Sequence, residues 1–101
     1  MLETLSPQVL KALTDVTGEM TLDSAVRIVT RDAVEHRLEN ISDQIRAFEQ
    51  KYGMPFPQFD AAFQARAIPN QHSFAIEQDY LEWEGLICRQ RRLQEVQEWL
   101  G

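Results

Sequence analysis

Four acidic side chains in the last third of the chain are the residues best suited to chemistry. Glu77, Asp79, Glu82 and Glu84 lie close together in the sequence, and paired carboxylates can serve acid–base catalysis or hold a hard metal ion. On a helix, however, only residues three or four apart share a face, as Asp79 and Glu82 do, so the four acids spread around the cylinder. We interpret them as a solvated face whose negative charge suits the start of a helix.

The histidines and the single cysteine form no catalytic or metal-binding pattern. A helical di-metal site needs a glutamate three residues before each histidine, but Ala33 and Pro69 occupy those positions before His36 and His72. Cys88 lies on the apolar flank of an expected helix, where we expect a buried, inert thiol. The glycines are isolated and form no phosphate-binding loop. We therefore expect no catalytic residue, no metal site, no cofactor and no enzymatic activity.

Charge and composition exclude several further classes of protein. The net charge of −6 opposes binding to nucleic-acid phosphates and to anionic membranes. The basic cluster Arg89, Arg91 and Arg92 is followed at helical spacing by Glu95 and Glu98, so we expect intrahelical ion pairs there. One cysteine allows no intrachain disulfide, and the sequence starts without the basic, apolar pattern of a signal peptide. We expect a cytoplasmic protein that binds neither nucleic acid nor membrane.

Helices must position these side chains, because apolar residues recur every three or four positions along most of the chain. Ser6, Pro7 and Gly18 delimit a short helix over residues 7–16. Thr21 caps a long helix over residues 21–52, which ends before Gly53. From Val34 this helix carries a heptad seam of the coiled-coil type, ending Ile41, Ile45, Phe48 and Tyr52.

The apolar stripe of that long helix slips by one residue between Ala33 and Val34. The slip indicates either a rotated stripe on one continuous helix or a break, and Asp32 could cap a new helix if the chain broke there. We expect continuity, because neither glycine nor proline interrupts this stretch.

Prolines separate the first long helix from a second. We predict a short connector helix over residues 57–66, whose Phe59 and Phe63 plug the end of the hairpin, and a long helix over residues 73–100 capped by Ser73. The fold is therefore predicted to be all-α. It is a single domain, residues 1–101, in which two long antiparallel helices form a hairpin accompanied by a short N-terminal helix and the connector helix.

The long helices exceed the size of a compact domain. At 1.5 Å per residue they extend about 48 Å and about 42 Å, whereas a compact chain of this length has a diameter of roughly 34 Å. Such helices leave faces without cover, so we expect a homodimer or larger oligomer, or a bound partner.

Apolar residues on more than one side of the last helix indicate where the additional contact lies. A helix of this kind is buried by more than one neighbour, and large aromatic residues dominate both cores and interfaces. For Trp83 we leave open whether it belongs to the core or to an interface. The expected partner-binding or oligomer-interface residues are Ile76, Tyr80, Trp83, Ile87, Trp99, Phe56 and Phe59.

Two segments of the sequence resemble a known group of proteins. They are residues 48–54, FEQKYGM, continued by Phe56 and Phe59, and residues 73–84, SFAIEQDYLEWE. Their order and spacing over residues 30–95 resemble small helical prokaryotic proteins of two-gene, toxin–antitoxin-type operons. Pro55 and Gly85 depart from that pattern. A glycine within a helix costs about 1 kcal/mol relative to alanine, and Gly85 can instead mark a close approach between helices.

The resemblance implies an antitoxin-like protein that binds and neutralises a small toxin-like partner. We therefore expect a non-enzymatic protein-binding module that masks this partner with its aromatic helical faces. Its acidic charge would steer a basic partner. The alternative is a structural helical module that associates only with itself.

Overall fold

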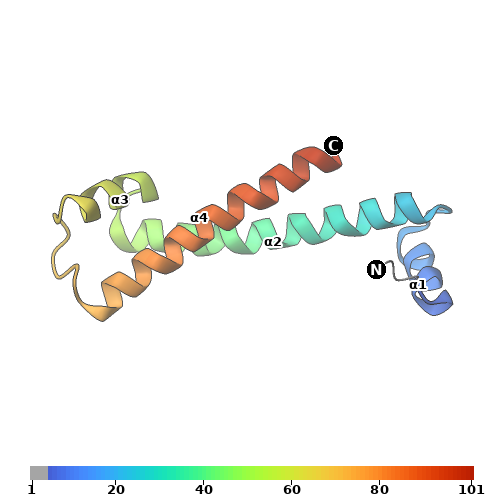
Figure 1. The fold of residues 1–101 in the computed structure, drawn as a ribbon, viewed down its shortest axis with the longest axis horizontal. Helices are drawn as coiled ribbons and strands as arrows, with labels where there is room; N and C mark the ends of the chain where they lie inside the picture. The colour runs from blue at the N-terminus through green and yellow to red at the C-terminus, as the bar shows by residue number, and fades with distance from the viewer. Residues whose placement is uncertain (1–4) are drawn as a thin grey trace.

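The computed structural model describes residues 5–101, and within them every regular element is an α-helix (Figure 1). The helices are α1 (Pro7–Thr17), α2 (Leu22–Tyr52), α3 (Phe56–Gln64) and α4 (Phe74–Leu100). Helices α2 and α4 run in opposite directions and pack across one another, α1 folds back on the start of α2, and α3 lies at the closed end of the hairpin. The predicted all-helical fold and the packing of the two long helices are confirmed.

Local sequence signals account for the helix ends. The side chains of Ser6, Thr21 and Ser73 each accept a hydrogen bond from the backbone amide three residues later, at 3.2, 3.2 and 3.3 Å. Gly18 and Gly53 end α1 and α2 with φ of 71° and 69°, a left-handed conformation that glycine adopts without steric cost. The connector helix α3 begins at Phe56 and ends at Gln64, against the predicted range of 57–66.

Helix α2 is continuous through the slip in its apolar stripe, so the alternative of a break near Asp32 is wrong. The slip corresponds to a change of neighbour. Ala25 is buried near α1, whereas Val34, Ile41 and Ile45 are buried along the part that packs on α4. Ala25 and Val34 are nine residues apart, which is about half a turn around a helix of 3.6 residues per turn. Helices α1 and α4 therefore use opposite sides of α2.

The molecule is elongated, and most of its core lies at one end. The radius of gyration is 19.4 Å and the extents are 57 × 26 × 19 Å, against about 13 Å for a compact domain of this length. Ile41, Ile45, Phe59 and Trp83 form the centre of the core. The accessible surface is 7616 Å², whereas a compact chain of this mass exposes about 5,900 Å². The shape therefore leaves roughly 1,700 Å² of additional surface in water.

Candidate protein-binding surfaces

The acidic residues of α4 do not converge on a site. Glu77, Glu82 and Glu84 are exposed, and only Asp79 turns toward the protein interior. Across residues 5–101, no group of three or more histidine, cysteine, aspartate or glutamate side chains is placed to hold a metal ion. The reactive side chains thus give no observation that favours a catalytic centre.

An aromatic cluster fills the closed end of the hairpin, with Trp83 at its centre. The Trp83 ring stacks on Phe48 at 5.4 Å between centroids, and Phe59 and Phe56 lie at 5.1 and 5.3 Å. Trp83 and Phe59 are completely buried. The indole Nε1 of Trp83 has no hydrogen-bond partner, so the Trp83 side chain itself is held by apolar contact alone.

Hydrogen bonds to Asp79 fasten the end of α2 to the start of α4. Tyr52 donates its hydroxyl to Asp79 Oδ2 at 2.6 Å, and Lys51 Nζ donates to the same oxygen at 2.5 Å. Burial by itself would raise the pKa of Asp79, but the hydrogen bonds from Lys51 and Tyr52 outweigh burial and lower the pKa. Burial raises the pKa of Tyr52 well above its usual value, and the neighbouring carboxylate of Asp79 raises it further.

A second tyrosine connects α4 to α3 in the same way. Tyr80 donates its hydroxyl to Asp60 Oδ1 at 2.5 Å. This hydrogen bond, together with burial, raises the pKa of Tyr80 to about 12. Both tyrosines are thus held protonated as hydrogen-bond donors, which is a structural role and not the state of a general base at neutral pH.

The structure separates the seven residues predicted to form an interface. Trp83 and Phe59 are completely buried and cannot contact a partner in this conformation. Of the two alternatives for Trp83, the structure therefore shows the core and not an interface. Ile76, Tyr80, Ile87 and Phe56 are half-buried beside the same core. Trp99 alone is largely exposed, at 76 %, with the Arg27 guanidinium 5.8 Å from its ring centroid.

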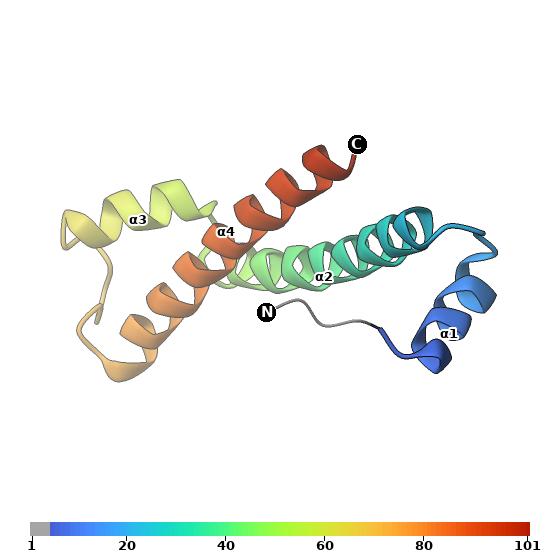
Figure 2. The same cartoon turned by 45° about the vertical axis from the view of Figure 1, so that its right-hand side comes forward.

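Seven exposed apolar residues lie on or next to α1 and the start of α2, at the end of the molecule away from the aromatic cluster. Figure 2 shows how these two helices meet. Helix α1 has no buried residue, and Val16 and Met20 are 78 % and 95 % exposed. Scattered apolar residues are ordinary on protein surfaces, but a contiguous patch marks an interaction site. We call this surface the amino-terminal corner, and it consists of Leu5, Val9, Leu10, Val16, Met20, Leu22 and Val26.

An open groove of about 280 Å³ runs through this corner between α1 and α2. Its lining is entirely apolar and consists of Val9, Ala12, Leu13, Val16 and Val29. Small-molecule sites usually measure about 300–1,000 Å³ and contain a few polar groups that fix orientation. This groove is smaller and has no such group, so it suits the apolar side chains of another protein segment.

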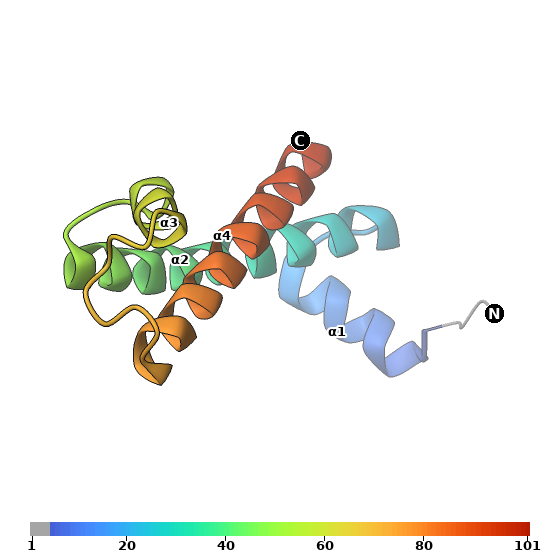
Figure 3. The same ribbon diagram turned by 60° about the vertical axis from the view of Figure 1, so that its left-hand side comes forward.

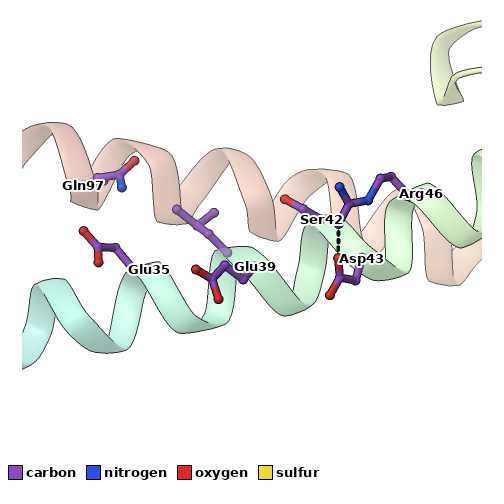
Figure 4. Close-up of a pocket in the computed structure, with 7 residues that line it drawn as sticks. Glu35, Glu39, Ser42, Asp43, Arg46 and Gln97 are labelled. Carbon is purple, nitrogen blue, oxygen red and sulfur yellow. Dashed lines mark hydrogen bonds and ion pairs between the residues drawn. The ribbon is translucent and has the colours of Figure 1, made fainter.

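An acidic furrow of about 580 Å³ runs between α2 and α4. Figure 4 shows that α2 supplies Glu35, Glu39 and Asp43, and that Gln97 comes from α4. Arg46 pairs with Asp43, while Glu35 and Glu39 have no cationic partner among residues 5–101. These carboxylates are exposed, so the furrow adds negative potential to the surface without forming a catalytic arrangement.

The outer face of α4 differs from the expectation at three points. Cys88 is exposed, so the predicted buried thiol is wrong. Apart from the neighbouring backbone of α4 itself, no atom lies within 4 Å of the position that a Gly85 side chain would occupy, so no close helix approach within the chain explains this glycine. Within residues 5–101, none of Arg89, Arg91 and Arg92 takes part in the predicted ion pairs. The first two differences share one cause, which is that α2 contacts the Trp83 side of α4.

Sequence reasoning did not assign the amino-terminal corner to an interface. A signal for it was present, because Val9, Leu13 and Val16 give a short helix an apolar face of its own. A single neighbouring helix cannot cover that face together with Leu22 and Val26 on the start of α2.

Comparisons with known protein families, with characterised proteins and with solved structures find no match. None of the helices in residues 5–101 has a stretch long and apolar enough to cross a membrane. The function is therefore proposed from the surfaces described above.

Proposed function

We propose that this protein is a non-enzymatic protein-binding module of antitoxin-like type, which covers a small, basic partner protein. The observation that carries the proposal is the amino-terminal corner, which has seven exposed apolar residues, two of which, Val9 and Val16, also line an apolar groove. The partner's contribution is an amphipathic helix or loop whose apolar side chains enter that groove.

The area available supports a specific complex. A standard protein interface buries about 800 Å² on each partner, and the elongated shape leaves roughly 1,700 Å² more surface than a compact chain exposes. Apolar surface removed from water contributes about 25 cal/mol per Å² before the costs of association are subtracted. Val16 and Met20, the most exposed members of the corner, have the most surface to bury.

The charge of the chain supports a basic partner. The net charge is −6, and the carboxylates of the acidic furrow extend along the middle of α2. Charge complementarity of this kind accelerates association more than it strengthens the final complex, and salt weakens the effect.

Co-expression with the protein encoded by the adjacent gene tests the proposal. We expect a complex that survives size-exclusion chromatography and is lost in Val16→Glu and Met20→Glu variants, because each places a charge on the apolar contact. Gln8→Glu is the matched control, since it adds the same charge at an exposed polar position of α1. If the two proteins elute separately and the neighbour is harmless when expressed alone, the antitoxin-like function is wrong.

The second candidate function is a structural module that associates only with itself, which the same excess of surface favours. In that case the purified protein is an oligomer that Val16→Glu dissociates, and the adjacent gene product does not bind it. Light scattering on the Val16→Glu variant alone and on the mixture of wild type and neighbour separates the two functions.

A further inference from the structure

We propose that two copies of this chain pair through the outer face of α4, antiparallel and crossing at Gly85. The contact surface, which we call the α4 stripe, consists of Phe74, Leu81, Gly85 and Cys88. It is separate from the amino-terminal corner, so this proposal does not depend on the proposed function.

The α4 stripe is a helix seam without a partner in this chain. Phe74, Leu81 and Cys88 are spaced by seven residues, and Gly85 lies four residues after Leu81 on the same face. Phe74 and Leu81 are 81 % and 62 % exposed, and Cys88 is exposed as well. Trp83 marks the side of α4 that packs on α2. It follows Leu81 by two residues, which is a rotation of about 200°, so Leu81 lies on the opposite side of the helix. A seven-residue apolar spacing is the pattern with which one helix packs on another.

The geometry around Gly85 forms a socket. A shallow hollow of about 260 Å³ is bordered by Gly85, Cys88, Arg89 and Arg92. These positions are i, i+3, i+4 and i+7 of a helix, the four residues that form a hole for a side chain of a facing helix. The hollow exists because Gly85 has no side chain and no other part of the chain fills the space. In an antiparallel pair centred on residue 85, the residue of the second copy that faces this hollow is Leu81.

The charges along α4 select the second copy as the occupant and the antiparallel direction. Glu77 and Glu82 flank the first half of the stripe, and Arg89 and Arg91 flank the second half. An antiparallel crossing at residue 85 places Glu77 within a turn of Arg91 of the second copy, and Glu82 beside its Arg89. The antiparallel pair brings one set of like charges together, the two Glu84 residues near the crossing, whereas a parallel pair would set like charges side by side along both halves of the stripe. Exposed pairs contribute only about 0.2–1 kcal/mol each, so they determine direction more than affinity.

These charged residues of α4 are largely unpaired within the chain, which supports a second copy as the binding partner. Among residues 5–101, Glu82, Arg89 and Arg91 have no ion-pair partner, and Glu77 has only His72 at 3.5 Å. The excess surface of roughly 1,700 Å² is enough for this interface and for the corner together, at about 800 Å² each.

Disulfide trapping tests the direction and register. In the proposed pair the two Cys88 residues are offset by about 9 Å along the axis at 1.5 Å per residue, too far for a disulfide, which needs Cα atoms within about 7 Å. Residue 81 lies about 1.5 Å along the axis from Cys88 of the second copy. Mild oxidation should therefore join residue 81 of the Leu81→Cys variant to Cys88 of the second copy and give a covalent dimer. The wild type and the double variant L81C/C88S should not be cross-linked. Gln50→Cys, an exposed position of α2, measures collisional cross-linking.

Light scattering tests the dimer without cysteine chemistry. The wild type should have a mass of about 23 kDa, twice the 11.7 kDa of one chain, and Leu81→Glu should be monomeric at the same concentration, with circular dichroism unchanged. Glu77→Arg should weaken the dimer, and adding Arg91→Glu should restore it. A monomeric wild type overturns the proposal, as does cross-linking of wild-type Cys88 at the rate of the Leu81→Cys variant. Because Leu81 lies outside the amino-terminal corner, Leu81→Glu should leave binding of the adjacent gene product intact, so the two proposals fail separately.

Discussion

The two tryptophans of this chain provide a matched pair for measuring what the core contributes. Trp83 is fully buried and Trp99 is 76 % exposed, although both are on α4. Replacing a buried tryptophan by alanine costs about 3–5 kcal/mol, and a chain of this length has a total stability of about 5–15 kcal/mol. The core is small and lies at one end of an elongated molecule, so the stability belongs near the lower limit. Trp83→Ala should therefore keep only about 0–2 kcal/mol of stability in the absence of denaturant.

Trp99→Ala removes a ring of the same size from water-exposed surface and should change stability by about 0.5 kcal/mol or less. Urea unfolding followed by circular dichroism measures both variants, at one protein concentration because association would add to apparent stability. With a urea slope of about 1–1.5 kcal/mol/M, Trp83→Ala should lower the midpoint by about 2–5 M. Trp83→Phe should be milder, since it also removes the unpaired indole N–H. Equal midpoint shifts for Trp83→Ala and Trp99→Ala would refute the assignment of Trp83 to the core.

Three further outcomes follow from individual residues. The chain has two tyrosines, and the pKa of each is raised. Absorbance at 295 nm should therefore show almost no tyrosinate at pH 10 in the folded protein. Ionisation of half of the tyrosine at that pH would contradict the hydrogen bonds to Asp79 and Asp60. The folded-state pKa of Asp79 lies below its usual 3.8, so its stabilisation is present above that pH and is lost as the pH falls through the lowered value. Asp79→Asn should therefore be less stable than the wild type at pH 7 and show a flatter acid limb in unfolding titrations. The methyl group of Gly85→Ala would meet no atom of the chain beyond the neighbouring backbone of α4, so thermal unfolding of a monomeric Leu81→Glu background should show a gain of about 1 kcal/mol. In the wild-type background the same change should weaken the dimer.

The caps and the helix ends could be predicted from the sequence because they depend on local chemistry. Ser6, Thr21 and Ser73 begin their helices with side-chain hydrogen bonds that three-residue spacing already implies. Gly18 and Gly53 end helices for a reason that is equally local. The aromatic residues around Trp83 were also recognisable as a group, since they are large, apolar and close together in two segments.

The orientation of α4 could not be predicted in the same way. Two overlapping apolar seams compete on this helix, and which of them faces α2 is decided by packing across the hairpin. The sequence predicts a buried Cys88 and offers a close helix approach as an explanation of Gly85, but both residues lie on the outer side of α4, because α2 contacts the side that carries Trp83. For α2, by contrast, the phase slip between Ala33 and Val34 coincides with the change from α1 to α4 as the neighbouring helix, so the sequence contained a signal for this change.

The use of opposite sides of α2 by α1 and α4 has a consequence for how the chain opens. Helix α1 has no buried residue and packs mainly on the start of α2, far from the aromatic cluster at the other end (Figure 3). Its amides are therefore exchangeable through a local opening that leaves the hairpin intact, at a fraction of the free energy of global unfolding. The chain thus behaves as two units of unequal stability joined by one continuous helix. A protein that occupies the groove between α1 and α2 would either pin the weaker unit in place or substitute for it, and hydrogen-exchange protection of α1 distinguishes these two modes of binding.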